Sequence, residues 1–266
     1  MTDTDQNARF TDGTGYEKFM GQWSRIAGRL FLGWLSLPRG LRWLDVGCGT
    51  GAFTEIIQQS SDASEIIAID PSAAQVSYAQ SRTNAEGIEF RVADARTMPF
   101  ENGRFDVAVS ALVLNFIPNR EKAVAEMRRV VRPGGTVAAY VWDFAGGNET
   151  AQHLNSAVRE LEGPRYRSPG SNPESATGEY LKALFEGAGL ADVKTRPLDI
   201  TVTFPDFDDY WNSNAISHPQ VANLIKSFSD EKRQRLIALV KARLPVDDRG
   251  GISYPARVNA VKGRRV

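Results

Sequence analysis

Short apolar runs alternate with helix-like segments between residues 41 and 142, and this alternation constrains the possible folds strongly. The apolar runs, each of a length typical of strands, lie at 41–46, 66–70, 88–93, 105–110 and 136–142. The segments at 51–59 and 121–131 have the apolar spacing of helices. Ser72 and Gln75 form a capping box that predicts the start of another helix, and a Pro133-Gly134-Gly135 turn is expected before the last apolar run. Strands that alternate with helices indicate a parallel sheet with helices on both faces. The sequence therefore predicts an α/β fold.

The flanking segments have a different pattern. Apolar side chains in 16–37 recur at intervals of three and four, which predicts one or two helices. After residue 143 the sequence predicts, in order, a loop over 144–178 with a short helix at 152–161, a helix at 178–188, a strand at 193–204, helices within 206–244 and a strand at 252–262. We interpret 206–244 as an insertion between the last two strands.

Composition excludes several classes of protein. Lys plus Arg and Asp plus Glu both total 32, whereas a nucleic-acid-binding chain usually has a basic surplus. Cys48 is the single cysteine, so no internal disulfide and no zinc site are expected. The polar start lacks the apolar stretch of a signal peptide, and no apolar run is long enough to span a membrane. We expect a soluble cytoplasmic protein that binds neither nucleic acid nor membrane nor metal.

A glycine-rich turn joins the first strand of the alternating region to a helix. Its sequence, LDVGCGTGAF at 44–53, places Gly47, Gly49 and Gly51 directly after the apolar run. Glycines at such a turn let the backbone bend tightly and approach a ligand that a Cβ would repel. In α/β folds this ligand lies in the crevice at the carboxyl ends of the strands.

The turn alone is compatible with two kinds of cofactor. Gly47, Gly49 and Ala52 satisfy the dinucleotide fingerprint, and Asp70 lies 23 residues after Gly47, where it would bind a ribose. Asp45 and Asp94, however, add carboxylates before the turn and after the third strand. Carboxylates repel a pyrophosphate but suit the ammonium group of an amino-acid ligand and the amino group of adenine.

At this point the sequence resembles the class I S-adenosylmethionine-dependent methyltransferases, in particular the small-molecule group that includes ubiquinone and menaquinone C-methyltransferases. The resemblance covers about 40–145 and rests on motifs in order: LDVGCGTG at 44–51, IIAIDPS at 66–72, ADA at 93–95 with MPF at 98–100, FDVAVSALVLNFIPN at 105–119, and RPGG at 132–135. It implies that Asp70 bridges the ribose hydroxyls, that Asp94 and Ala95 bind adenine, and that Ser110 lies near the methionine moiety.

The resemblance also implies a Rossmann-like seven-stranded sheet, mostly parallel, with an antiparallel last strand and a helical cap. We expect one methyltransferase domain over 1–266. Its predicted core comprises 38–143, 178–205 and 250–266, and its predicted cap comprises 14–37, 144–177 and 206–249. The expected cofactor is S-adenosyl-L-methionine. The predicted cofactor-binding residues are Tyr16, Met20, Arg25, Asp45, Gly47, Cys48, Gly49, Thr50, Gly51, Asp70, Pro71, Asp94, Ala95 and Ser110, with Arg25 near the cofactor carboxylate.

The expected reaction is in-line transfer of a methyl group to a small-molecule acceptor. Because positioning of the reactants supplies much of such a reaction, a base is needed only if the acceptor must lose a proton. Candidates for that base are Asp143, His153 and His218. For both histidines, exposure on the cap is an alternative to a catalytic role. For Cys48, packing in the turn is the alternative to a role as a nucleophile, and no partner histidine is evident.

Two other functions remain open on the sequence. The same glycine turn would suit an NAD(P)-dependent oxidoreductase, and the same fold would suit a non-catalytic cofactor-binding protein. Each acid also has a structural alternative, since Asp45, Asp70 and Asp94 all lie at turns, where acidic residues are common. Their joint order after the glycine turn favours a methyltransferase.

Overall fold

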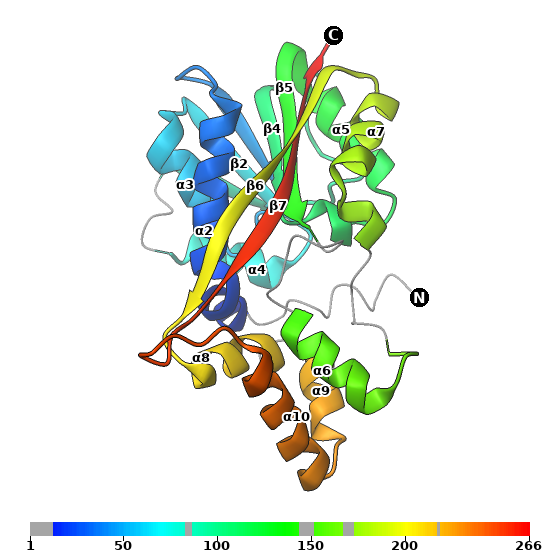
Figure 1. Cartoon of the computed structure of the whole chain (residues 1–266). Helices are drawn as coiled ribbons and strands as arrows, with labels where there is room; N and C mark the ends of the chain where they lie inside the picture. Colours follow the sequence, from blue (N-terminus) through cyan, green and yellow to red (C-terminus); the bar gives the residue numbers. More distant parts are fainter. Residues whose placement is uncertain (1–12, 83–86, 144–151, 167–172, 217–218) are drawn as a thin grey trace.

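A computed structural model of the chain describes residues 13–82, 87–143, 152–166, 173–216 and 219–266. A seven-stranded sheet in the order β3-β2-β1-β4-β5-β7-β6 forms its centre (Figure 1). The strands are β1 (Arg42–Val46), β2 (Glu65–Asp70), β3 (Ile88–Val92), β4 (Phe105–Ala111), β5 (Val131–Trp142), β6 (Leu190–Phe204) and β7 (Ile252–Arg265). The first five strands pair in parallel, and β7 pairs antiparallel with both β5 and β6. The predicted Rossmann-like sheet is confirmed.

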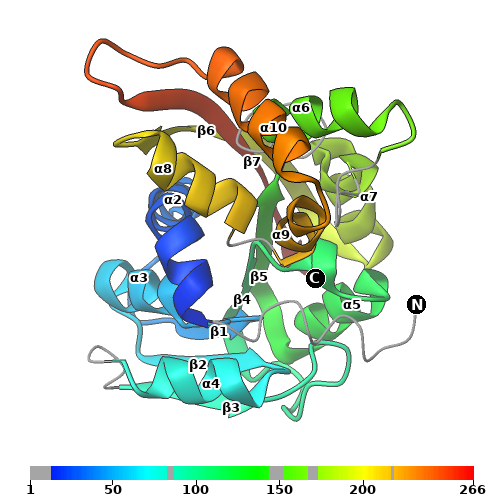
Figure 2. The same ribbon diagram turned by 90° about the horizontal axis from the view of Figure 1, so that it is seen from below.

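Helices cover both faces of this sheet. Seen from below in Figure 2, α2 (Gly13–Leu35) and α3 (Ala52–Ser61) lie on one side, and α5 (Arg120–Val130) and α7 (Gly178–Gly187) lie on the other. Successive side chains of a strand point to opposite faces of the sheet. Because helices cover both faces here, β1 needs apolar residues at successive positions. Trp43 packs in the cluster beneath α2 and α3, whereas Leu44 packs in the cluster beneath α5 and α7.

The segment predicted as one or two helices is the single helix α2. Ala27 and Phe31 are buried four residues apart, and the Phe31 ring lies 4.7 Å from that of Tyr140 on β5. At the end of α2, the Lys262 ammonium group donates to the carbonyl oxygens of Trp34 and Leu35 at 3.0 and 3.2 Å. A cation at a helix C-terminus satisfies free carbonyl groups and the helix dipole. The C-terminal half of α2 is therefore attached to the sheet.

A second group of helices lies beyond the carboxyl ends of the parallel strands (Figure 1). It contains α6 (Gln152–Glu162), α8 (Phe207–Trp211), the π-helix η4 (Asn212–Ile216), α9 (Pro219–Lys226) and α10 (Asp230–Arg243). Except for α6, these elements come between β6 and β7, as the predicted insertion requires. No helix of the described ranges has both the length and the apolar character needed to cross a membrane. The division into core and cap remains a prediction.

The RPGG segment is not the predicted turn before β5 but an irregular part of that strand. The register with β4 shifts between Phe105, which pairs with Val131, and Val107, which pairs with Thr136. Gly135 fits there because a Cβ would come within 2.6 Å of the Asp106 carbonyl oxygen. The extra residues are accommodated as a bulge, so β5 begins five residues earlier than its apolar pattern predicts.

Candidate functional site

The glycine turn forms a tight bend between β1 and α3. Gly47, Gly49 and Gly51 have φ angles of 79°, 53° and 81°, a region that side chains disfavour. The amides of Gly47 and Cys48 both donate to the Ile69 carbonyl oxygen, at 2.8 and 2.9 Å. These bonds hold the turn against the end of β2, as the sequence predicts for a strand–turn–helix unit.

The three glycines face different surroundings. A Cβ on Gly47 would lie 2.5 Å from Cγ1 of Val113, and one on Gly51 would lie 3.2 Å from the Phe90 ring. A Cβ on Gly49 would meet no atom within 4 Å. Gly47 and Gly51 are therefore required by packing within the protein, whereas Gly49 presents bare backbone to open space.

Asp70 at the end of β2 holds the turn from the other side. Its Oδ2 accepts a hydrogen bond from the Gly49 amide at 3.0 Å, and its Oδ1 accepts one from the Ser72 amide at 2.9 Å. Burial raises the pKa of the Asp70 carboxyl, and the two amide bonds oppose that rise. The carboxylate is thus fixed in orientation before any ligand binds.

The helix α4 (Ala73–Gln80) begins beside Asp70, with a cap that differs from the expected capping box. The Ser72 hydroxyl accepts from the Gln75 amide at 3.4 Å, as expected for an N-cap. The Ser72 amide, which the Gln75 side chain would satisfy in a capping box, donates to Asp70 instead. Asp70 therefore also shapes the start of α4.

Asp45 lies beneath the turn and is fully buried. The Thr54 hydroxyl donates to its Oδ2 at 2.7 Å, whereas its Oδ1 has no hydrogen-bond partner in the described part of the chain. Desolvation raises the pKa of Asp45 to about 7, against the lowering effect of the Thr54 bond. A buried carboxyl with an unused oxygen is energetically costly, which is typical of a functional position.

Asp45→Asn is expected to flatten the pH dependence of stability. Between pH 4 and 7 the folded chain retains a proton on Asp45 that the unfolded chain loses, so the free energy of unfolding decreases as pH rises. Between pH 5 and pH 8, the free energy of unfolding of the wild-type chain should fall by ~2–3 kcal/mol more than that of the variant. Urea unfolding at each pH measures this difference. Asp62→Asn, at a side chain 74% exposed, should follow the wild type. Equal slopes in all three proteins would contradict the assignment.

Asp94 follows β3 and forms an ion pair with Arg96. The Arg96 Nη2 lies 2.7 Å from the Asp94 Oδ2, and the Arg96 amide donates to the Asp94 Oδ1 at 2.7 Å. The guanidinium group holds the pKa of the Asp94 carboxyl below its usual range. Asp94 is therefore ionised at neutral pH and can accept further hydrogen bonds.

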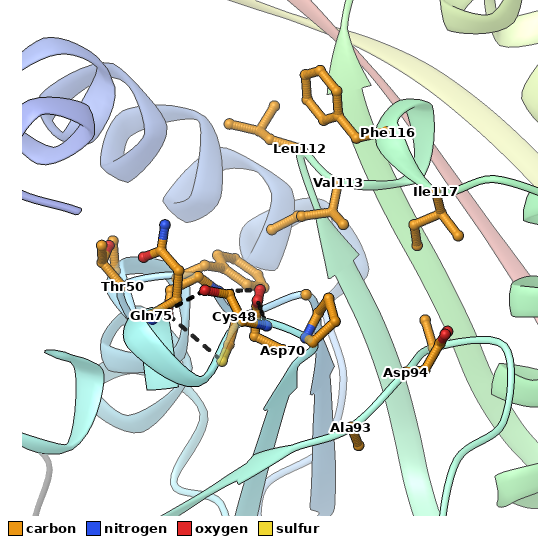
Figure 3. Close-up of a pocket in the computed structure, with 18 of the residues that line it drawn as sticks. Cys48, Thr50, Asp70, Gln75, Ala93, Asp94, Leu112, Val113, Phe116 and Ile117 are labelled. Carbon is orange, nitrogen blue, oxygen red and sulfur yellow. Dashed lines mark hydrogen bonds between the residues drawn. The ribbon is translucent and has the colours of Figure 1, made fainter. Parts of the chain in front are cut away.

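These elements surround a cavity of about 400 Å³ at the carboxyl ends of the strands (Figure 3). On one side lie the glycine turn, Asp70 and Gln75. The segment after β4 forms an apolar side, with Leu112 and Phe116 among its residues. The cavity thus combines oriented carboxylates and bare backbone with an apolar wall, at the place where this fold class binds ligands.

A methyltransferase domain family matches residues 44–139, which include the turn, the three carboxylates Asp45, Asp70 and Asp94, and β4. This match, together with the methyltransferases among the curated relatives, supports the predicted resemblance to the class I S-adenosylmethionine-dependent methyltransferases. S-adenosylmethionine is the cofactor of that family. The ubiquinone- and menaquinone-type subgroup remains a prediction.

Similar proteins include two curated methyltransferases. The phthiotriol/phenolphthiotriol dimycocerosates methyltransferase of Mycobacterium leprae is 28% identical over 56% of this chain and 59% of its own length. The malonyl-[acyl-carrier protein] O-methyltransferase of Methylococcus capsulatus is 30% identical over 53% of this chain and 48% of its own length. A solved phosphoethanolamine N-methyltransferase 2 of Haemonchus contortus has a TM-score of 0.56 at 16% identity and covers 95% of this chain and 57% of its own. The chain thus spans about half to three fifths of these proteins, and the solved structure shows likeness of fold.

Eight of the predicted cofactor-binding residues line the cavity. They are Gly47, Cys48, Gly49, Thr50, Asp70, Pro71, Asp94 and Ala95. Asp45, Gly51 and Ser110 are buried and do not line it, and Arg25 is also absent from the lining. Its neighbour Ser24 on α2 lines the cavity instead. Tyr16 and Met20 belong to α2, but their side chains lie outside the described part of the structure.

Several residues that line the cavity are not predicted from the sequence. The most informative are Gln75 and Arg96 on the polar side and the apolar residues after β4. Gln75 is interpreted from the sequence only as a cap, and nothing in the spacing of Arg96 distinguishes it from a surface arginine. For the apolar residues after β4, a signal exists: apolar residues continue past the expected strand end over 111–117, interrupted only by Asn115.

Of the candidate bases, Asp143 and His153 do not line the cavity. Asp143 is buried after β5, where its amide donates to the Arg257 carbonyl oxygen at 2.9 Å. The His153 ring on α6 lies 5.7 Å from the Tyr254 ring, and His218 lies outside the described residues. Burial raises the pKa of the Cys48 thiol well above its usual value, which keeps the thiol protonated and favours packing over nucleophilic attack.

Proposed function

We propose that this chain binds S-adenosylmethionine in the cavity and transfers its methyl group to a small-molecule acceptor. The observation that carries the proposal is the Asp70 carboxylate, fixed by two amides beside the open backbone of Gly49. A carboxylate in this setting accepts from two neighbouring hydroxyl groups, as a ribose presents. The family match over residues 44–139 supports the same cofactor.

The remaining parts of the cofactor also match residues of this site. Asp94, ionised and at the cavity wall, would accept from the adenine amino group. The bare backbone at Gly49 leaves room for close approach. Asp45 lies behind the turn with an oxygen unused, and its negative charge would balance the cationic amino-acid end. We expect cofactor binding to release a proton from Asp45 near neutral pH.

A dinucleotide cofactor fits this site poorly. Among the described lining residues, the charged side chains are Asp70, Asp94 and Arg96, and the guanidinium group of Arg96 is paired with Asp94. The carboxylates would repel a pyrophosphate at the turn. These charges favour a methyltransferase over the oxidoreductase alternative.

The bound cofactor would supply a methyl group already activated by its sulfonium. The contribution of the chain would be to position the reactants. The glycine turn and Asp70 would orient the cofactor. Proximity and alignment of two reactants can supply roughly 7–11 kcal/mol of the barrier. The described lining includes no histidine, so an acceptor that needs no strong base fits this site best.

A comparison of two ligands tests the proposal. S-adenosylhomocysteine at 100 times its Kd should raise the Tm by about 5–10 °C, since it would stabilise the folded chain by about 2.7 kcal/mol. NADH at the same concentration should leave the Tm unchanged. Stabilisation by NADH alone would establish the oxidoreductase alternative. Binding of S-adenosylhomocysteine without label transfer from methyl-labelled cofactor to any of a panel of phenols, amines and thiols would favour the non-catalytic alternative.

A further inference from the structure

The connection between β4 and α5 forms a continuous apolar wall of the cavity. Its lining residues are Leu112, Val113, Phe116, Ile117 and Pro118, which we name the 112–118 wall. Figure 3 shows Leu112, Val113, Phe116 and Ile117 grouped apart from Thr50 and Asp70. Leu114 points away from the cavity into the core beneath α5 and α7, and so anchors the segment. The position of the wall is therefore fixed by packing in the core.

The backbone of the wall begins in a strained conformation. Leu112 has a φ angle of 61°, which is rare for a bulky residue and persists only when surrounding structure enforces it. Its amide donates to the Tyr140 carbonyl oxygen at 2.8 Å. Val113 packs against the backbone of Gly47, where no Cβ would fit. The wall is thus held at a fixed distance from the glycine turn. A methyl acceptor on the wall and a cofactor at the turn would need such a fixed arrangement.

The chemistry of the wall differs from that of the rest of the cavity. The charged lining residues of the described chain, Asp70, Asp94 and Arg96, all follow β2 and β3. The 112–118 wall has no ionisable side chain, and Phe53 and Tyr140 add aromatic surface to the lining. Val113, Phe116 and Ile117 remain partly exposed, so they offer apolar surface to a ligand. Covering such surface with a charged group would cost desolvation without a partner.

We propose that the 112–118 wall binds the methyl acceptor and selects an uncharged molecule with an apolar body. This inference rests on the proposed function, because the polar side of the cavity is then filled by the cofactor. The nucleophilic atom of the acceptor faces the cofactor, and its ring or alkyl chain lies on Phe116 and Ile117. The strain at Leu112 keeps that surface directed at the cavity.

Binding of 4-n-alkylphenols, from ethyl to octyl, tests this inference by calorimetry on chain saturated with S-adenosylhomocysteine. Each methylene that the wall covers should lower the Kd three- to fourfold. An analogue whose alkyl chain ends in a carboxylate should bind at least tenfold more weakly than the alkylphenol of equal length. Phe116→Ser and Ile117→Ser should each weaken octylphenol binding about tenfold and change the Kd of S-adenosylhomocysteine less than threefold.

Val92→Ser is the matched control, because Val92 is an exposed apolar residue directly before the lining residue Ala93 but does not itself line the cavity. It should bind octylphenol like the wild type. No dependence on chain length, tighter binding of the carboxylate analogue, or equal binding by Phe116→Ser would overturn the inference. The alkylphenol series is also measured without S-adenosylhomocysteine. A chain-length dependence there, combined with no S-adenosylhomocysteine binding, would reject the proposed function but retain an apolar ligand site.

Discussion

Gly49→Ala is expected to weaken S-adenosylhomocysteine binding by about 100-fold while the chain stays folded. A Cβ at this position meets no protein atom within 4 Å, so the apoprotein has room for it. Because Gly49 lines the cavity, the added methyl group would occupy the space that the cofactor needs. The φ angle of 53° costs an alanine roughly 1–2 kcal/mol, a moderate loss for a folded domain. Calorimetric titration measures the Kd, and circular dichroism checks the fold.

Gly40→Ala separates the effect of the added methyl group from that of backbone strain. Gly40 has a φ angle of 74° and open space around a Cβ, but it does not line the cavity. This variant should lose a similar amount of stability and retain the wild-type Kd. Gly47→Ala should behave in a third way, with a large loss of stability, because Val113 lies 2.5 Å from the added atom. Wild-type affinity in Gly49→Ala would show that the cofactor does not approach this backbone.

Asp70→Asn is expected to lower affinity for S-adenosylhomocysteine by about two orders of magnitude. Hydrogen bonds to a charged group are each worth ~1.5–3 kcal/mol, and an amide replaces one acceptor oxygen by a donor. That donor would face either the Gly49 amide or the Ser72 amide, both of which also donate. The variant would thus lose part of the turn geometry together with the charge that a ribose would bind. Equilibrium dialysis with labelled cofactor measures the change.

Asp106→Asn is the control for Asp70→Asn. The Asp106 carboxylate also accepts from a backbone amide, that of Arg42 at 2.9 Å, and it lies outside the cavity. Its ion pairs with Arg42 and Arg132 hold the pKa of Asp106 far below its usual range. The control should therefore lose stability above pH 4 without a change in cofactor affinity. A comparable loss of affinity in both variants would indicate that Asp70 acts only through stability.

The local pattern of the sequence was sufficient to predict the strand–turn–helix unit and the order of elements. Several glycines directly after an apolar run indicate a tight turn at the end of a strand. The alternation of strands and helices permits few topologies. The same pattern placed Asp70 and Asp94 at the cavity, because the carboxyl ends of parallel strands meet at one edge. It did not show that Asp45 points beneath the turn, since that depends on which face of β1 packs against Thr54 on α3.

The apolar wall was not predictable for a different reason. In the run from 111 to 117, apolar character alone does not distinguish Leu114, which enters the core, from Phe116, which lines the cavity. The distinction follows from the left-handed backbone at Leu112, for which leucine gives no local signal. The bulge at Gly135 was missed likewise, because its cause is contact with the Asp106 carbonyl oxygen in the neighbouring strand.

The strand order has a consequence for how the chain reaches its final state during synthesis. β6 pairs with β7 alone, and β7 lies between β6 and β5 although it is made last of the three. Until residues 252–265 leave the ribosome, β6 has no neighbour in the sheet, and the end of α2 lacks the Lys262 ammonium group. The first five strands can assemble while translation continues. Completion of that edge, and attachment of the helices between β6 and β7, must wait for the final strand.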